Sequence, residues 1–97
     1  MYAVIFTATT NPLDDEYSQT AAKMRDLAFS KYGCLELNSV CQGDQEITVS
    51  YWPTLAHISA WQADPAHRAA QALGKQKWYK AYSVQVTHIE RQYQQKC

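Results

Sequence analysis

The side chains best suited to chemistry lie in the second half of the chain, in the stretch ISAWQADPAHRAAQ from Ile58 to Gln71. His67 and Gln71 are four residues apart, so they would share one face of a helix. A neutral imidazole, with an ordinary pKa of about 6.5, can accept a proton near neutral pH. His67 is therefore a candidate general base. The plainer alternative is a histidine near a helix start that only hydrogen-bonds the adjoining loop.

Aromatic side chains gather in the same half of the chain. The sequence contains three tryptophans and seven tyrosines among 97 residues. Such side chains can line an apolar pocket with a few polar tips, which is the usual form of a small-molecule site. The candidate pocket residues are Trp52, Trp61, Trp78, Tyr79 and Tyr82. The alternative is that these aromatics form the core of a small dimer.

Other kinds of catalytic site find no support in the sequence. His57, His67 and His88 form no i, i+4 pair, and no Cys/His spacing matches a zinc site, so no metal site is predicted. No GxSxG motif marks a nucleophile, and the three glycines are scattered along the chain. Rossmann and P-loop sites for flavin, nicotinamide or nucleotides are therefore excluded, and no cofactor is predicted.

Charge and cysteine content restrict the partners and the compartment. Nine basic and nine acidic side chains give zero net charge, so neither nucleic acid nor an anionic membrane is an expected partner. No segment approaches the roughly 20 apolar residues that would span a bilayer. Cys34, Cys41 and Cys97 form no CxxC motif, and we find no secretory signal. These features predict a cytoplasmic protein with free thiols.

The elements that must position these residues begin with a strand and a helix. Residues 2–9 are apolar or β-branched at both the odd-numbered and the even-numbered positions, which predicts a strand buried on both of its faces. The stretch NPLDDEY that comes next predicts a helix start, with Asn11 as the cap and Pro12 in the first helical position. Gly33 is expected to end this helix as a left-handed cap.

The remaining elements are marked by turn and cap residues. A short connector that contains Gly43 predicts an antiparallel hairpin. Proline cannot continue a helix, so Pro65 is expected to interrupt the next one, while Asp64 caps the helical segment after the break. The predicted elements are strands over residues 34–41 and 46–52, a helix from Thr54 that Asp64-Pro65 interrupts and Gly74 closes, a turn around WYKAY, and a strand over residues 83–93.

The order of these elements predicts the fold. Strand, helix, strand, strand, helix, strand is the ferredoxin-like βαββαβ order of an α+β protein, with a four-stranded antiparallel sheet and the helices on one face. We expect a single domain over residues 1–97, because no linker or repeat divides the chain. The sheet face without helices would need a cover, and a homodimer formed through that face is the simplest one.

The stretch YWPTLAHISAWQADPAHRAAQALGKQKWYKAYSVQVTHIER resembles the C-terminal half of the antibiotic biosynthesis monooxygenase (ABM) family. In that family a strand leads into a helix that ends in Trp and an acidic residue. A His-bearing segment, a WY-rich turn and a final strand come after this helix. The first half, with its short strand and its NPLDDEY helix start, is compatible with the family. The resemblance implies a dimeric α/β barrel in which two ferredoxin-like sheets pack face to face.

The resemblance also implies a function. Some ABM members oxygenate polycyclic aromatic phenols or quinols without metal or flavin: the deprotonated substrate itself reduces dioxygen. The implied function here is a cofactor-independent monooxygenase acting on a small aromatic phenol or quinol. In that function Trp61 would be a pocket wall and His67 the catalytic base. The implied hydrogen-bond donors are Tyr51, Tyr79 or Tyr82.

Two other functions belong to the same fold. In a haem-degrading branch, a tryptophan that corresponds to Trp61 is followed ten residues later by a haem-ligating histidine. Here that position is Gln71, and an asparagine of the first strand is missing at Phe6-Thr7-Ala8. Haem breakdown is therefore the weaker expectation. The other alternative is a non-catalytic dimeric module that binds a small hydrophobic ligand or has a filled pocket.

Overall fold

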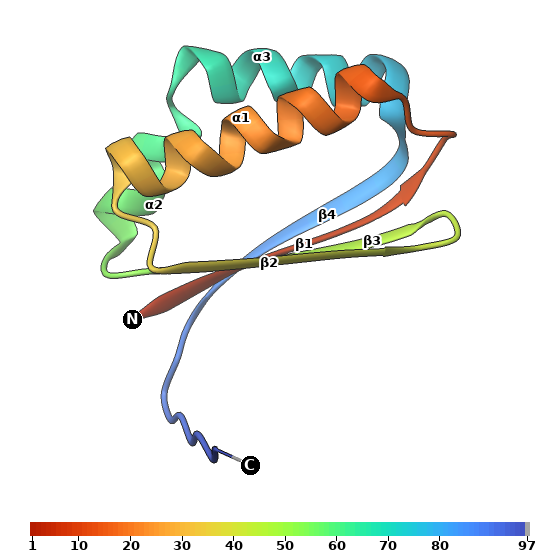
Figure 1. Ribbon diagram of the computed structural model, residues 1–97. Coiled ribbons are helices and arrows are strands. Elements are labelled where there is room, and N and C mark those ends of the chain that lie inside the picture. The colour runs from red at the N-terminus through yellow and green to blue at the C-terminus, as the bar shows by residue number, and fades with distance from the viewer. Residues whose placement is uncertain (97) are drawn as a thin grey trace.

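The structure is a computed structural model that describes residues 1–96. Its strands form one antiparallel sheet in the order β2-β3-β1-β4, and the helices lie on one face of that sheet (Figure 1). The elements are β1 (Tyr2–Thr10), α1 (Asp15–Tyr32), β2 (Glu36–Gln42), β3 (Gln45–Trp52), α2 (Leu55–Gln62), α3 (Pro65–Leu73), a π-helical turn η1 (Gly74–Trp78) and β4 (Tyr79–His88). The predicted ferredoxin-like α+β fold is confirmed.

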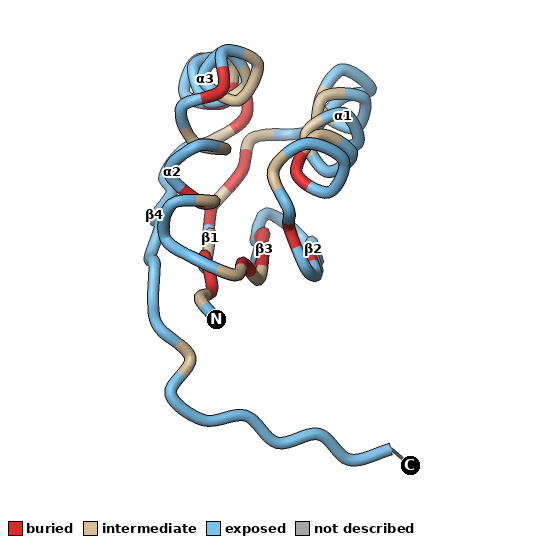
Figure 2. Tube along the Cα trace, turned by 90° about the vertical axis from the view of Figure 1, so that its left-hand side faces the viewer, coloured by how far each residue is buried: buried red, intermediate tan, exposed pale blue. Residues whose placement is uncertain are grey.

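The core lies between the sheet and the helices. Trp52 is completely buried, and its indole nitrogen donates a hydrogen bond to the Ser50 hydroxyl at 2.8 Å. Viewed along the strands, α1 covers the β2 side of the sheet and α3 stands over the β4 side (Figure 2). The buried core residues are Val4, Ala28, Cys34, Leu37, Trp52 and Ile58.

Several predicted helix ends and turns are confirmed. Gly33 ends α1 with φ 75°, a conformation that glycine adopts without a steric penalty. The β2–β3 hairpin turns at Gly43, where φ is 59°. The Thr54 hydroxyl accepts a hydrogen bond from the backbone of His57 and caps α2. Asp64 caps α3, with Pro65 in its first turn.

The predicted start of α1 is wrong. The helix begins at Asp15, and its cap is Asp14, whose carboxylate accepts a hydrogen bond from the Tyr17 backbone at 2.9 Å. Asn11 is engaged elsewhere: its backbone N–H donates to the Trp78 carbonyl at 2.8 Å, and its side-chain amide donates to the Lys77 carbonyl. These long-range bonds hold the segment before α1 extended, so the helix begins later.

The predicted end of α3 at Gly74 is confirmed, whereas the predicted start of the last strand is wrong. Gly74 has φ −60°, and the chain passes through it into η1. A Cβ atom at Gly74 would lie 2.7 Å from the Tyr79 ring, so glycine is needed there for close approach rather than for a left-handed conformation. The last strand begins at Tyr79, within WYKAY, and ends at His88. It is therefore shifted toward the N-terminus from residues 83–93.

A bulge in the sheet decides which way Tyr79 points. Thr9 pairs with Ala81, but Thr10 pairs with Tyr79, so Lys80 is an extra residue in β4. One extra residue moves the next side chain to the other face of a sheet. Tyr79 consequently packs against Phe6 on the helix-covered face, with ring centroids 5.2 Å apart.

The face of the sheet opposite the helices is here called the open face. It carries Ile5, Ile47, Val49 and Tyr51, which lie opposite one another across the β1–β3 pair or two residues apart. Ile47 is 47% exposed. The expectation of a strand buried on both faces holds only in part, since Ala3 is buried and Ile5 is partly covered.

The chain beyond β4 runs away from the sheet on the side of the open face (Figure 1). Within the described residues, Cys34 and Cys41 are free thiols. The third predicted free thiol, Cys97, lies outside the described residues. No helix in the part of the chain that the structure describes is long and apolar enough to cross a membrane.

Candidate functional site

The helix break places His67 directly against Trp61. Trp61 lies in the last turn of α2, Asp64-Pro65 starts α3, and His67 lies in the first turn of α3. Their rings meet edge to face, with centroids 4.3 Å apart and an interplanar angle of 60°. Trp61 packs on its other side against Trp52, at a centroid distance of 4.9 Å. The break between α2 and α3 therefore places the titratable ring of His67 in contact with the packed rings of Trp61 and Trp52.

Two nitrogen atoms of this pair are buried without a partner. Among residues 1–96, the buried side-chain polar atoms that make no hydrogen bond are Trp61 Nε1 and His67 Nδ1. A buried polar group without a hydrogen bond costs roughly 1–3 kcal/mol, and most native structures avoid that cost. Both atoms belong to rings in contact with each other, so the two unmet hydrogen bonds lie at one place, at the break between α2 and α3.

Burial sets the protonation state of His67. Desolvation lowers the pKa of its imidazole, and the nearby Asp64 carboxylate opposes this effect only partly. The imidazole is therefore neutral at neutral pH. A neutral imidazole is the form that can accept a proton from a bound substrate.

Asp64 holds the break between α2 and α3 in place. Its carboxylate accepts hydrogen bonds from the backbone of Ala66 at 2.7 Å and of His67 at 3.4 Å. It also accepts a hydrogen bond from the Tyr32 hydroxyl at 2.5 Å and lies 3.8 Å from the Lys31 ammonium. The hydrogen bond from Tyr32 is the largest cause that lowers the pKa of Asp64. The C-terminal end of α1 thus fixes the start of the helix that carries His67.

An apolar row on the helix-covered face of the sheet lies on the side where α3 stands. The apolar row consists of Phe6 on β1 and Tyr82, Val84 and Val86 on β4, whose side chains share the face of Val4 because of the strand pairing. Val84 is 40% and Val86 is 44% exposed, and no residue of α3 is buried. The helix layer therefore covers this part of the sheet incompletely, and apolar surface faces α3.

The structure brings only some of the predicted site residues together. Trp61 and His67 are in contact. Gln71 lies one turn further along α3 and is exposed. Trp78 is buried and donates its indole N–H to Asp14 at 3.1 Å, which gives it a structural role at the start of α1. Tyr51 is on the open face of the sheet.

Tyr79 and Tyr82 lie at the other end of the helix-covered face. The Tyr82 ring stacks on Phe6 with centroids 5.8 Å apart and lies 6.0 Å from the Tyr79 ring. Tyr82 pairs with Ala8, whereas Tyr2, at the start of β1, pairs with Trp52. Six residues of strand therefore separate the two ends, roughly 20 Å at about 3.3 Å per residue.

The sequence did not point to Glu46, which is buried at this second end. Glu46 is 4% exposed, and its carboxylate accepts a hydrogen bond from the Tyr17 hydroxyl. The salt bridges formed among residues 1–96 do not include it. Alternation along β3 places it on the same face as Trp52, and an acidic residue at such a position is the one available sequence signal.

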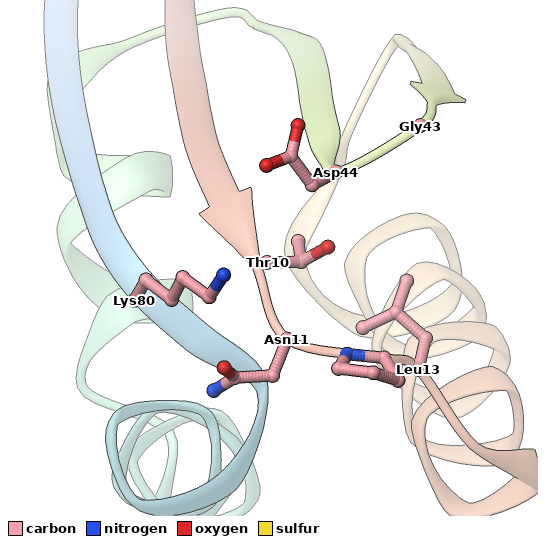
Figure 3. A pocket seen from close by; sticks show the side chains of 7 residues that line it. Thr10, Asn11, Leu13, Gly43, Asp44 and Lys80 are labelled. Atoms are coloured by element: carbon pink, nitrogen blue, oxygen red, sulfur yellow. The ribbon is translucent and has the colours of Figure 1, made fainter.

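Two cavities lie away from the Trp61–His67 pair. One, of about 410 Å³, opens beside the β2–β3 hairpin and is lined by Thr10, Asp44 and Lys80, among others (Figure 3). The other, of about 730 Å³, lies between the open face and residues 91–94 beyond β4. In residues 1–96, no group of three or more His, Cys, Asp or Glu side chains has an arrangement that could hold a metal ion.

A relative of known sequence decides the family. The chain is 39% identical over 92 residues to the uncharacterized protein YqjZ of Bacillus subtilis, an alignment that covers 94% of this chain and 81% of YqjZ. The chain belongs to the YqjZ family. No family model matches the sequence.

Solved structures that resemble this YqjZ-family chain share its fold. SnoaB, a cofactor-independent oxygenase from Streptomyces nogalater, superposes with a TM-score of 0.78 at 7% identity over 94% of each chain. Rv0793 from Mycobacterium tuberculosis gives 0.81 at 12% identity over 96% of this chain and 98% of its own. An antibiotic biosynthesis monooxygenase gives 0.69 at 14% identity over 94% of this chain and all of its own. The chain therefore has the ABM fold.

Proposed function

We propose that the protein is a cofactor-independent monooxygenase that acts on a small aromatic phenol or quinol. The observation that carries this proposal is the pair of buried, unpartnered nitrogens on Trp61 and His67, which lie in contact with each other. The apolar row offers an aromatic ligand a surface under the same helix layer. SnoaB, which has the same fold, is a cofactor-independent oxygenase.

In this function His67 removes the substrate proton. The O–H or enolisable C–H bond of the substrate breaks, its proton binds to the neutral imidazole, and the electron pair stays on the substrate. The resulting electron-rich anion reduces dioxygen. One oxygen atom becomes a carbonyl oxygen on a ring carbon, and the other leaves as water with two hydrogens, one from that carbon and one from the substrate hydroxyl by way of His67. Trp61 orients the ring system and excludes water from the anion.

The proposal includes a homodimer formed through the open face. Proteins of this fold are typically dimers. Ile47, Val49 and Tyr51 would be covered by their copies, which removes apolar surface from water at about 25 cal/mol per Å². Such an interface leaves the opposite, helix-covered face free for the substrate.

Oxygen consumption tests the catalytic role of His67. Purified protein, treated with a chelator, is supplied with anthrone, and the rate is compared with that of His67→Ala. We expect the variant to lose about 10²-fold or more in rate, the usual contribution of a general base. His88→Gln, which changes an exposed histidine of β4, is the matched control and should keep the parental rate. Equal rates in the parent and in His67→Ala would remove His67 as the base.

A second candidate function is a non-catalytic dimeric module that binds a small hydrophobic ligand. The observation in its favour is that the two cavities beside the hairpin and on the open face do not reach Trp61 or His67. Native mass spectrometry of the purified protein distinguishes the two functions. A co-purified hydrophobic compound that is released unchanged in the presence of dioxygen would support the binding module over the oxygenase.

A further inference from the structure

The cavity of about 410 Å³ beside the β2–β3 hairpin, here called the hairpin cavity, includes no residue of α2 or α3. Its volume is within the range of about 300–1,000 Å³ that small-molecule sites occupy. It is lined by residues 10–13 at and after the end of β1, by residues 43–44 of the hairpin turn and by Lys80 of β4. Three parts of the chain that are distant in sequence therefore meet around it.

Backbone hydrogen bonds hold the walls of the hairpin cavity in place. The Thr10 N–H donates to the Asp44 carbonyl at 2.8 Å, which ties the end of β1 to the hairpin turn. The Asn11 N–H donates to the Trp78 carbonyl at 2.8 Å, which ties the next residue to η1. The shape of the cavity is therefore set by hydrogen-bonded backbone on both sides of Thr10.

The bulge in β4 places a cation at the hairpin cavity. Thr9 pairs with Ala81 and Thr10 pairs with Tyr79, so Lys80 between them has no partner in β1. Bulges are frequent next to functional sites, where the extra residue redirects a side chain. The Lys80 side chain reaches from β4 toward Thr10 (Figure 3). The extra residue thus adds an ammonium group to the wall of the cavity.

A carboxylate lines the same cavity from the hairpin side. Asp44 lies in the hairpin turn, across the end of β1 from Lys80 (Figure 3). Its Oδ1 atom accepts a hydrogen bond from the Gln45 side-chain amide at 3.1 Å, a neutral donor that leaves the charge uncompensated. The ion pairs formed among residues 1–96 include neither Asp44 nor Lys80. A cation and an anion therefore stand apart on two walls of one cavity.

The rest of the lining includes apolar side chains. Pro12 and Leu13 belong to it, and 37% of the Leu13 surface is exposed. Asp44 would repel a simple anion bound at Lys80, and Lys80 would repel a simple cation bound at Asp44. A small molecule that carries both charges and an apolar group matches all of these walls. Amino acids with apolar side chains have this combination.

We infer that the hairpin cavity binds a free α-amino acid with an apolar side chain. The Lys80 ammonium donates to the carboxylate of the ligand, and the Asp44 carboxylate accepts from its ammonium group. The apolar side chain of the ligand lies against Pro12 and Leu13. This binding site goes beyond the proposed oxygenase and does not depend on it, because the cavity includes no residue of the helices that carry Trp61 and His67.

Nuclear magnetic resonance of the isotope-labelled full chain, titrated with L-leucine, tests this inference. We expect saturable shifts of the backbone amides of Leu13, Gly43 and Lys80. Leucinamide lacks the carboxylate and isocaproate lacks the ammonium group, so each should bind at least about fivefold more weakly, the effect of losing one charge pair that is partly in solvent. These three titrations use the unaltered protein and do not depend on the folding of a variant.

Two variants assign the charged contacts. Lys80→Met and Asp44→Asn remove one charge each with little change in side-chain length, and each should raise the Kd for L-leucine at least about fivefold. The matched controls are Lys75→Met and Asp26→Asn, which change an exposed lysine and an exposed aspartate outside the cavity. Both controls should keep the parental Kd.

The outcomes decide the inference without reference to oxidation. No saturable shift with L-leucine, or shifts only at residues outside the hairpin cavity, would overturn it. Isocaproate or leucinamide that binds as tightly as L-leucine would also overturn it, since one charge would then be enough. An unchanged Kd in Lys80→Met or in Asp44→Asn would refute the contacts assigned to the ligand. Binding that needs both charges supports the site even in a protein that oxidises no phenol or quinol.

Discussion

The imidazole of His67 meets the indole of Trp61 edge to face at 4.3 Å, and each ring has a buried nitrogen without a hydrogen-bond partner. The contact depends on the helix break, because a continuous helix would place residues six apart on different faces. Asp64 fixes the geometry of the break through two backbone hydrogen bonds and one from Tyr32. Asp64 therefore holds Trp61 and His67 in contact, and it can do so without touching a ligand itself.

His67 should make the protein sensitive to mild acid. Burial lowers the pKa of His67 in the folded state below the value of about 6.5 in the unfolded chain. Between these two values the unfolded chain binds a proton that the folded protein does not, so the free energy of unfolding falls as pH decreases through that window. Urea unfolding at pH 7.5 and 5.5 should show a smaller loss of stability for His67→Gln than for the parent. An equal loss in both proteins would contradict the burial of the imidazole.

Gly74→Ala should destabilise the protein although alanine is the better helix former. Replacing a helical glycine by alanine usually raises the free energy of unfolding by about 1 kcal/mol. Here the added Cβ atom would lie 2.7 Å from the Tyr79 ring, and the ring would have to move. Thermal unfolding measures the effect. In the Tyr79→Ala background, where the ring is absent, the same change should become neutral or stabilising. An additive double-mutant cycle would exclude the contact as the reason for glycine at this position.

Thr54→Ala should reduce the free energy of unfolding by about 1 kcal/mol, because the hydroxyl that caps α2 is lost. Thr54→Ser keeps the hydroxyl and should retain most of the stability. Urea unfolding of the two variants provides the comparison. Since α2 carries Trp61, the near-ultraviolet circular dichroism of the alanine variant should also change. Identical stability of the alanine and serine variants would argue against the role of the Thr54 hydroxyl as a cap.

Val49→Lys should convert the proposed dimer into monomers. Val49 lies in a central strand on the open face, where a lysine is tolerated in a monomer but would be buried against its copy in a dimer. Light scattering coupled to size-exclusion chromatography gives the mass in solution. The control is Leu55→Lys, which changes an apolar residue on α2 that is 51% exposed. A monomeric parent, or a dimeric Val49→Lys variant, would refute an interface through the open face.

The parts of the fold that the sequence predicted are those marked by local chemistry. Thr54 and Asp64 each cap the helix that comes after them in the chain, and Gly43 supplies the left-handed turn of the hairpin. The error at Asn11 has a cause outside its own segment. Asparagine is typical of helix starts, but here Asn11 forms hydrogen bonds with Lys77 and Trp78, which are distant in the chain.

The candidate site was predictable to a smaller extent than the fold. The proximity of Trp61 and His67 is a consequence of a helix break that the sequence marks with Asp64-Pro65. The orientation of Tyr79 is not marked in this way, because a one-residue bulge reverses the face that alternation would assign. Glu46 was missed because its significance comes from burial against Tyr17, a residue of a different element.

The stacking of Trp52, Trp61 and His67 also makes the molecule its own optical probe. A protonated imidazole in contact with an indole quenches its fluorescence, whereas a neutral one does so weakly, and the nearby Trp52 ring can transfer excitation to Trp61. The emission intensity should therefore titrate with the imidazole. It should also change when an aromatic compound occupies this end of the sheet, so ligands can be screened by light alone, without a label and before any reaction has been measured.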